Sequence, residues 1–414
     1  MTFDHCKLDE VIKSEKGSIA MGPFGSNITA DNFVEFGVPV IQGRQLNGLF
    51  LEDIGYRFLT PEKAKSLKNS KAVKRDIVIT HRGTIGQVGI IPDHSEYDEY
   101  IISQSQLKFT VDEDICCPFF TYYFLCSHIG QYELLMNTTS VGVPAIASPT
   151  ASVKNITIPF PKLSTQQKIS TNLKMIDLQI LKFRKIEESL QMIIASIFRS
   201  WFIDFDPVKT KAEGKIPYGL DEETIALFPN SFEDSELGLN PTGWKVKNYS
   251  DYMDLKYGGA LKAGERIDGE FPVLGSNGIV GEHNEYLVNG PGIVIGRKGN
   301  PGTINWINEN FFPIDTTFYV QTKDENVPLE FLYHSLNFAS LPWFSADSAV
   351  PGINRNVILQ QKFIFPPIEL IEAFRKISVT IFQQNLNTRV AMNSIESLRD
   401  AILPRLMSGE LKVN

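Results

Sequence analysis

Two short turns in this sequence combine glycine with a basic side chain in a way that suits the binding of phosphates or base edges. The first is Arg-Gly-Thr-Ile-Gly at residues 82–86, and the second is Arg-Lys-Gly-Asn-Pro-Gly at residues 297–302. Glycine lets backbone N–H groups approach a phosphate, and a neighbouring arginine can reach a phosphate or the O6/N7 edge of guanine. One such turn is usually structural, but two in register favour a binding role. The candidates from these turns are Arg82, Thr84, Arg297, Lys298 and Asn300.

Two further polar clusters contain side chains with the donor and acceptor geometry that base edges require. Each cluster is also compatible with ordinary turn chemistry, in which asparagine and serine bond to nearby backbone. We include both clusters among the candidate contacts to base edges. They are Gln42, Arg44, Gln45 and Asn47 in the first half of the chain, and Ser276 and Asn277 in the second.

The charge of the chain is unevenly distributed. The net charge of −8 argues against a nucleic-acid ligand, because phosphate binding depends on lysine and arginine. Residues 57–82, however, contain eight positive residues and two acidic ones, and they add Lys71, Lys74 and Arg75 to the candidates. Residues 213–236 contain seven acidic residues and one lysine. Either stretch alone is also explained as solvated surface.

The sequence contains no recognisable catalytic motif. It lacks a dinucleotide-binding fingerprint, a phosphate loop, an Asn-Pro-Pro-Tyr motif, a nucleophile elbow and paired histidine ligands. The four cysteines and six histidines have no metal-site spacing, so we expect reduced thiols and no metal or cofactor in this chain. No apolar run approaches the roughly 20 residues that cross a bilayer, which predicts a cytoplasmic protein with no membrane partner.

The turns belong to a longer internal repeat. Val-Pro-Ala-Ile at residues 143–146 returns as Val-Pro-Gly-Ile at residues 350–353, and the proline-rich segment at residues 158–161 returns at residues 364–367. Short apolar runs and turn residues around these motifs predict two strand-rich α+β domains. The sequence therefore predicts a pseudo-twofold repeat, with domains at residues 1–160 and 208–367.

Two long helices are predicted at residues 161–207 and 368–414. In the first, apolar residues recur at alternating intervals of four and three from Ile169 to Trp201, which is the period of a coiled coil. Pro207 is expected to end this helix, and the second is expected from about Glu369 to Met407. The simplest packing is antiparallel, one helix against the other, as a stiff spacer between the domains. The alternative is that each helix packs separately on its own domain.

The ends of the two halves resemble a known family. Ile-Pro-Phe-Pro-Lys-Leu-Ser-Thr-Gln-Gln-Lys-Ile at residues 158–169 is similar to the entry into the conserved helix of the specificity (S) subunits of type I restriction-modification systems, with Thr165 in place of the usual glutamate. Leu-Arg-Asp-Ala-Ile-Leu-Pro-Arg-Leu-Met-Ser-Gly-Glu-Leu at residues 398–411 is similar to that family's C-terminal motif. The resemblance covers essentially the whole chain.

This resemblance implies a non-catalytic subunit with two target-recognition domains, each reading one half of an asymmetric bipartite DNA site. The helical spacer would fix the gap and dock two modification (methyltransferase) subunits, and restriction (motor-nuclease) subunits would complete the complex. S-adenosylmethionine, ATP and Mg would then belong to the partners. Two alternatives stay open, namely a scaffold whose paired domains bind proteins, and an enzyme with a divergent centre.

Overall fold

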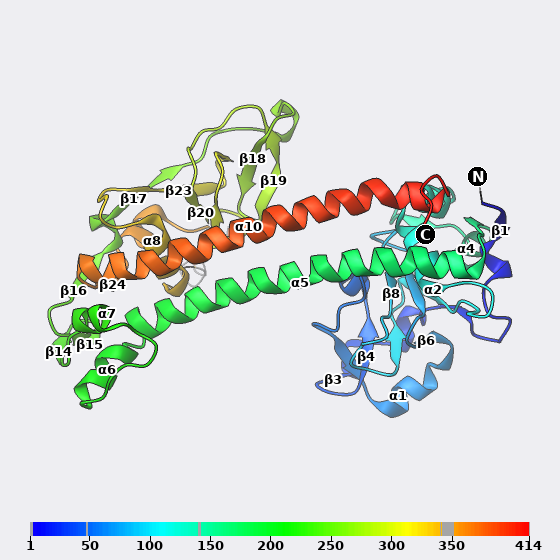
Figure 1. The fold of residues 1–414 in the computed structure, drawn as a ribbon, viewed down its shortest axis with the longest axis horizontal. Coiled ribbons are helices and arrows are strands. Elements are labelled where there is room, and N and C mark those ends of the chain that lie inside the picture. Colours follow the sequence, from blue (N-terminus) through cyan, green and yellow to red (C-terminus); the bar gives the residue numbers. More distant parts are fainter. Residues whose placement is uncertain (1–2, 47–48, 140–141, 340, 342–351, 414) are drawn as a thin grey trace. The chain divides into compact units, whose positions relative to one another are not determined.

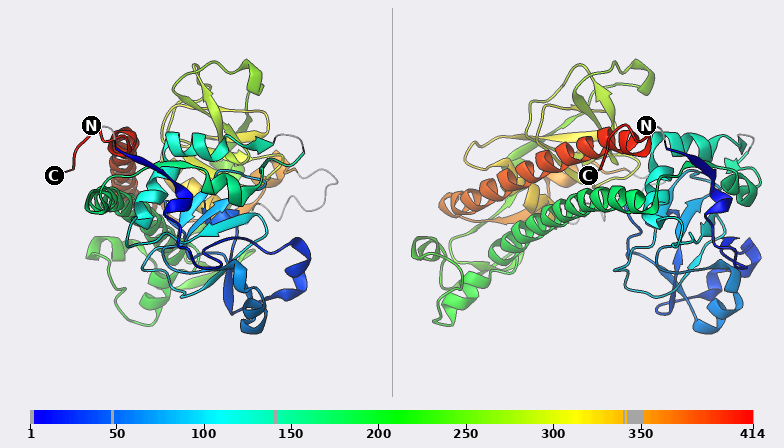
Figure 2. Two further views of the ribbon diagram at one scale, coloured as in Figure 1. Left: turned by 90° about the vertical axis from the view of Figure 1, so that its right-hand side faces the viewer. Right: turned by 45° about the vertical axis from the view of Figure 1, so that its right-hand side comes forward.

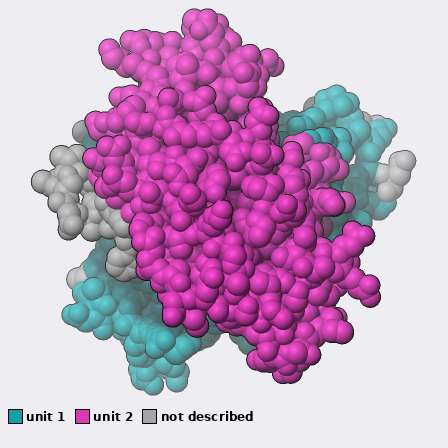
Figure 3. Space-filling view, turned by 90° about the vertical axis from the view of Figure 1, so that its left-hand side faces the viewer, with its two compact units in different colours: residues 1–185, 389–414 teal, residues 186–388 magenta. Residues whose placement is uncertain are grey.

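The computed structural model describes residues 3–46, 49–139, 142–339, 341 and 352–413 (Figure 1). The chain forms two compact units, shown in different colours in Figure 3. Unit 1 comprises residues 1–185 and 389–414, and unit 2 comprises residues 186–388. Each unit therefore combines one strand-rich region with parts of both long helices.

Unit 1 contains a four-stranded antiparallel sheet in the order β2-β10-β7-β8 and a five-stranded mixed sheet in the order β3-β5-β4-β9-β6. The strands of the first sheet are β2 (Ile19–Met21), β10 (Gln106–Phe109), β7 (Ile77–Thr80) and β8 (Val88–Ile90). Those of the second are β3 (Phe33–Val34), β5 (Arg57–Leu59), β4 (Val38–Ile41), β9 (Tyr100–Ile102) and β6 (Lys71–Ala72). The remaining elements are the strand pairs β1 (His5–Lys7) with β13 (Thr157–Pro159) and β11 (Thr138–Thr139) with β12 (Ala145–Ile146), and the helices α1 (Pro61–Ser66), α2 (Pro118–Cys126), α3 (His128–Leu135) and α4 (Pro149–Lys154).

Unit 2 repeats the four-stranded sheet in the order β17-β23-β20-β21, but its second sheet has three strands, β19-β18-β22. The strands of these sheets are β17 (Met253–Tyr257), β23 (Thr317–Thr322), β20 (Gly292–Gly296), β21 (Ile304–Ile307), β19 (Gly278–His283), β18 (Phe271–Gly275) and β22 (Phe312–Pro313). The other elements are β14 (Phe232–Ser235) paired with β15 (Gly238–Pro241), β16 (Lys245–Asn248) paired with β24 (Lys362–Phe365), and the helices α6 (Asp206–Ala212), α7 (Glu222–Leu227), α8 (Leu329–Phe338) and α9 (Arg355–Leu359).

The two four-stranded sheets correspond in detail. Gly22 follows β2, and a Cβ atom there would lie 1.8 Å from the carbonyl oxygen of Ser103. Gly258 follows β17, and a Cβ atom there would lie 2.1 Å from the carbonyl oxygen of Ile314. Only glycine lets the backbone approach so closely at these two places. The predicted α+β class and internal repeat are confirmed.

The long helices are α5 (Leu163–Phe202) and α10 (Ile368–Met407), each 40 residues long. The prediction that Pro207 ends the first helix is wrong, because the helix ends five residues earlier. Phe205 adopts the left-handed conformation with φ 55°, and Pro207 then lies in the first turn of α6. Proline is well tolerated at that position because the missing N–H would have no helical partner there.

Each unit contains contacts between the two helices. In unit 1, α5 and α10 run side by side (Figure 1, Figure 2). Arg399 pairs with Asp177 at 3.4 Å, and Arg184 pairs with Glu396 at 3.0 Å. Because the later residue of α5 pairs with the earlier residue of α10, the two helices are antiparallel. In unit 2, Phe198 and Phe202 near the end of α5 pack on Phe374 near the start of α10. The two helices therefore pack on each other in both units, as predicted. The four-segment domain division stays a prediction, because the compact units divide through the helices.

The aromatic and aliphatic side chains of each unit form a core that includes the helix ends. Ile169 and Leu173 of α5 and Leu406 of α10 are buried with the sheet residues of unit 1. In the described part of the chain, no helix is both long and apolar enough to cross a membrane.

Candidate nucleic-acid interface

The two glycine turns have the same backbone structure. In unit 1 the N–H of Gly86 donates to Thr80 O at 3.1 Å, and in unit 2 the N–H of Gly302 donates to Gly296 O at 2.8 Å. Gly83 and Gly86 have φ of 86° and 87°, and Gly299 and Gly302 have φ of 81° and 83°. These left-handed values explain why glycine recurs at both positions of both turns.

The second repeated motif packs directly against the turn. The backbone of Arg82 forms an isolated antiparallel β-bridge with Ala145, and the backbone of Lys298 forms the corresponding β-bridge with Gly352. The N–H of Ile146 donates to His81 O at 2.9 Å, and the N–H of Ile353 donates to Arg297 O at 3.0 Å. The two motifs that lie far apart in each half of the sequence are therefore parts of one local structure. Residues 350 and 351 of the second motif lie outside the described residues.

The bridges also establish which basic side chains correspond. Arg82 is equivalent to Lys298, because each forms the β-bridge to the second motif. His81 is equivalent to Arg297, because the carbonyl oxygen of each accepts a hydrogen bond from that motif. Arg82 and Lys298 are both exposed, and neither side chain has a hydrogen bond or ion pair with another described residue. Thr84 and Asn300 are exposed on the same turns. Within the part of the chain that the structure describes, these four side chains can meet a ligand.

Arg297 has a structural role that the sequence did not suggest. Its guanidinium carbon lies 4.9 Å from the ring centre of Tyr257 and 5.9 Å from that of Phe318, and Nη1 donates to Asp315 O at 3.0 Å. Stacking on aromatic faces is favourable for arginine and restrains its side chain. Arg297 therefore supports the turn from one side while Lys298 projects from it.

His81 occupies the equivalent place in unit 1. It is 6% exposed, and its Nε2 atom has no hydrogen-bond partner among the described residues. Burial lowers the pKa of His81, which favours the neutral ring. The two turns therefore have different supports, one neutral and one positively charged.

The two polar clusters follow equivalent strands, β4 and β18. Each of these strands pairs antiparallel with its neighbour in sequence and parallel with a later strand, β9 in unit 1 and β22 in unit 2. Arg44 and Asn277 are exposed and Gln42 is half-buried, so these three remain candidates. Asn47 lies outside the described residues.

Gln45 and Ser276 point into the protein, which corrects their selection as candidate contacts. Gln45 is 2% exposed, its Nε2 donates to Ile54 O at 3.1 Å, and its Oε1 accepts from the N–H of Gln42. Ser276 is 7% exposed and donates to Thr316 O at 2.7 Å. Both side chains already bond to backbone groups, so they hold the loops in place.

Three basic residues of the stretch before β7 have acidic partners in the fold. Lys71 pairs with Glu99, Lys74 with Asp98 at 3.2 Å, and Arg75 with Asp93 at 2.7 Å and Glu113 at 2.5 Å. Asp93, Asp98 and Glu99 follow β8 and Glu113 follows β10, so all four acidic partners lie outside the window in which the excess positive charge was counted. Lys71, Lys74 and Arg75 would each have to exchange an acidic partner for a phosphate, and all three stay candidates.

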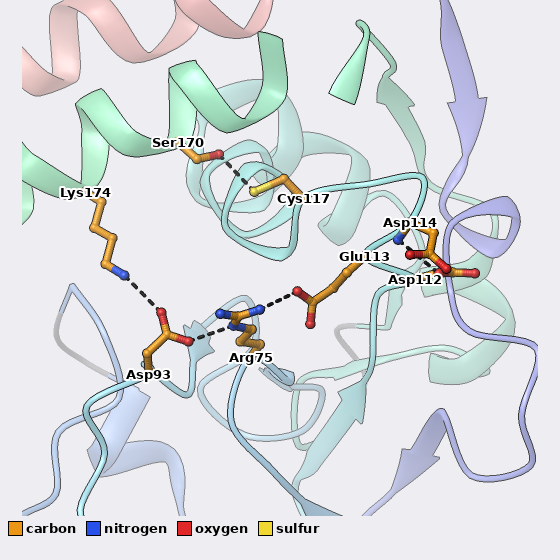
Figure 4. A network of polar contacts seen from close by, with 8 residues as sticks. All are labelled: Arg75, Asp93, Asp112, Glu113, Asp114, Cys117, Ser170 and Lys174. Atoms are coloured by element: carbon orange, nitrogen blue, oxygen red, sulfur yellow. Dashed lines mark hydrogen bonds and ion pairs between the residues drawn. The ribbon is translucent and has the colours of Figure 1, made fainter. Parts of the chain in front are cut away.

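Arg75 belongs to a different region of unit 1. It precedes β7, whereas Arg82 follows that strand, so the two arginines lie at opposite ends of it. Figure 4 shows Arg75 joined to Asp93 and Glu113, with Lys174 of α5 reaching Asp93 at 3.3 Å. A crevice of about 220 Å³ lies beside this network, between α5 and the start of α2. The network attaches the helix to the domain and is separate from the turn.

Comparison with known proteins is consistent with this geometry. The family model for the type I restriction modification DNA specificity domain matches residues 2–191 and 241–391. The chain belongs to this family. The matched regions cover most of both units, and the acidic segment at residues 213–236 lies between them.

Individual members of the specificity family are similar over most of their length. The chain is 24% identical to the type I restriction enzyme HindI specificity subunit of Haemophilus influenzae, over 82% of this chain and 88% of that protein. It is 23% identical to the MjaIX specificity subunit of Methanocaldococcus jannaschii, over 87% and 83%. The crystal structure of an S subunit from M. genitalium has the same fold, with TM-score 0.58 and 15% identity over 98% of this chain and 96% of that one.

Proposed function

We propose that this chain gives a type I restriction-modification complex its DNA sequence specificity, and that each unit reads one half of an asymmetric, bipartite site. Membership of the specificity family supports the first part. The observation that carries the second is the pair of equivalent turns, one per unit, from which Arg82 and Lys298 project without partners among the described residues. Arginine and lysine at such positions suit phosphates and the edge of guanine.

Different half-sites require different contacts, and the second sheets supply a source of difference. The four-stranded sheets of the two units have the same strand order. The sheet that holds the polar cluster, in contrast, has five strands in unit 1 and three in unit 2. We therefore assign recognition of the two half-sites to the turns together with the ends of β4 and β18. Arg44 and Asn277 are the exposed side chains there.

The long helices are proposed to fix the number of unspecified base pairs between the half-sites. Their outer faces expose apolar side chains, for example Met175 at 62% and Met192 at 63% on α5, and Val390 at 58% on α10. These exposed apolar side chains are proposed to contribute to a protein-binding surface. They are proposed to seat two modification subunits, with restriction subunits joining afterwards.

The chemistry is proposed to reside in those partners. S-adenosylmethionine, ATP and Mg would bind there, and this chain would bind and position DNA without catalysis, in the cytoplasm. The net charge of −8 is compatible with this role if the partners supply most of the phosphate contacts.

A binding experiment tests the proposal. The full-length chain and its modification subunit would be mixed with a duplex carrying the methylated motif found in cells, and with duplexes in which either half-site is scrambled. We expect a shift with the intact motif that is lost when either half is scrambled. A sequence-independent or absent shift would favour the protein-binding scaffold, and methyl transfer or cleavage by the chain alone would favour an enzyme.

A further inference from the structure

One aromatic ring of unit 1 is exposed at the end of the four-stranded sheet where the turn with Arg82 lies. Phe24 follows β2, and its side chain is 77% exposed. The residues around it hold the loop, because Pro23 is buried and the N–H of Asn27 donates to Phe24 O at 2.8 Å. The backbone of the loop is therefore held in place while the ring is left open to a ligand.

The loop after β2 and the turn after β7 leave the sheet at the same end. The N–H of Gly22, directly after β2, donates to Gln106 O at 2.8 Å, and the N–H of His81, directly after β7, donates to Ser105 O at 2.9 Å. The start of β10 therefore lies between the loop and the turn. Adjacent strands lie about 5 Å apart, so the loop and the turn are about 10 Å apart where they leave the sheet, which is the length of about three base pairs.

Polar and basic side chains surround the loop. Gln104 lies against it, because a Cβ atom built on Gly25 would lie 2.8 Å from Gln104 Oε1. The polar cluster after β4 reaches the same end of the sheet, since the N–H of Ser103 donates to Ile41 O at 2.9 Å. Gln104 and Arg44 are both exposed there. The exposed ring and the proposed DNA contacts of unit 1 therefore share one end of the sheet.

Exposure alone does not distinguish this ring from others on the surface. Single exposed apolar side chains are common in soluble proteins. Phe36 is 78% exposed, but it precedes β4, whereas the polar cluster follows that strand. The position of Phe24 among groups that suit DNA is what indicates a role for its ring.

Unit 2 has no aromatic ring at the corresponding place. Gly258 follows β17 as Gly22 follows β2, and the residue two positions after Gly258 is Ala260. Ala260 is also exposed, but its methyl group is too small to stack on a base. The two loops therefore differ in the one side chain that could enter a base stack.

We propose that Phe24 inserts between two base pairs of the half-site that unit 1 reads, and unstacks them. This rests on the proposed function, because it requires a half-site bound at the turn with Arg82. Phenylalanine wedges between base steps partly unstack and kink a duplex. An enzyme that acts on a base must take it out of the stack, so a step that is already open lowers the cost of that movement. Phe24 would thereby assist the proposed methyl-transferring partner.

The fluorescence of 2-aminopurine, which rises when this base is unstacked, tests the proposal. The full-length chain and its modification subunit would be bound at saturation to duplexes that carry the probe at each position of either half-site in turn. We expect Phe24→Ala to abolish the rise at one step of one half-site and to leave the signals of the other half-site unchanged. Affinity for the intact site should fall by about tenfold, as loss of a base–aromatic stack does.

Phe36→Ala is the matched control, because it removes an equally exposed ring from the same unit and should behave as wild type. Phe24→Leu should retain most of the fluorescence rise, since leucine also acts as a wedge. If wild type itself does not bind the site specifically, the proposed function fails. The inference alone is wrong if Phe24→Ala binds with unchanged fluorescence or if Phe36→Ala has the same effect. Weaker binding of Phe24→Ala to the modification subunit without DNA would overturn it as well, by making Phe24 a protein contact.

Discussion

At the scale of single residues, the turn side chains Arg82 and Lys298 carry the proposed recognition. They are equivalent by backbone hydrogen bonding, and each lies on a turn whose shape depends on two left-handed glycines. Because each unit has one of them, a change in either should affect one half-site. This separates a contact with DNA from a general effect on folding.

Arg82→Ala is expected to weaken or relax recognition of one half-site by about 1–3 kcal/mol, if the side chain makes a good base contact. Binding of the complex with its modification subunit would be measured on duplexes altered in either half. Lys71→Ala is the control, because Lys71 is already paired with Glu99 and should have little effect. Equal losses at both halves for Arg82→Ala would indicate a structural role.

Gly22→Ala is expected to lower the free energy of unfolding by about 1–3 kcal/mol, as overpacking of a core does. The added Cβ would meet the carbonyl of Ser103 at 1.8 Å. Gly264→Ala is the control, since an added Cβ there meets no atom within 4 Å. Urea unfolding of both variants would check this, and equal midpoints would contradict the close approach.

The sequence predicted the turns better than the residues around them. The repeat located Arg82 and Lys298 because the glycine spacing is local. The burial of Ser276 and the ion pair of Lys71 could not be predicted, because their partners Thr316 O and Glu99 are distant in sequence or outside the window considered. The close approach at Gly22 was missed for the same reason, since nothing near it in sequence indicates Ser103.

At the scale of elements, the helix ends are joined to the units by side chains of two kinds. Unit 1 uses the ion network of Arg75, Asp93 and Lys174 and the Asp177–Arg399 pair. Unit 2 uses an aromatic cluster in which His334 of α8 lies 5.6 Å from Phe198 and 5.9 Å from Phe374, measured between ring centres. The units should therefore respond differently to pH.

His334 is expected to make unit 2 less stable in mild acid. Burial lowers its pKa from 6.5 to about 4, so the unfolded chain binds the proton more readily. Stability that is present above pH 6.5 is then lost as the pH falls toward 4, by about 1–2 kcal/mol near pH 5. Denaturant unfolding at pH 7.5 and 5.0 would measure this loss.

His334→Phe should remove most of that dependence, because phenylalanine does not titrate and suits the aromatic neighbours. His128→Phe is the control, since His128 is exposed on α3. An unchanged pH dependence in His334→Phe would show that another group is responsible.

The helices themselves were predictable, because the 3.5-residue period is a local pattern. Their ends were less so. The first helix ends at Phe202 because the chain turns at Phe205, whose left-handed conformation no sequence rule anticipates for phenylalanine. The Asp177–Arg399 pair was not predicted, since it joins positions 222 residues apart.

At the scale of the whole molecule, the chain repeats a four-stranded sheet with its glycine turn, and the second sheet differs between the two units. The sequence predicted the repeat from short motifs that occur in both halves, namely the glycine turns and the proline-rich segments. It did not predict that the second sheet has five strands in one unit and three in the other, because those strands are short and lack a shared motif. The repeated four-stranded sheet and the different second sheets together suit two unlike recognition domains in one polypeptide.

The two long helices are proposed to set the gap between the two half-sites. Inserting one matched heptad into both α5 and α10 adds about 10 Å at 1.5 Å per residue, or about three base pairs of DNA. Long-read mapping of N6-methyladenine in cells that carry the chain and its modification subunit would report the methylated motif. We predict a gap longer by about three base pairs with both half-sites unchanged. An unchanged gap, or an altered half-site, would contradict the account.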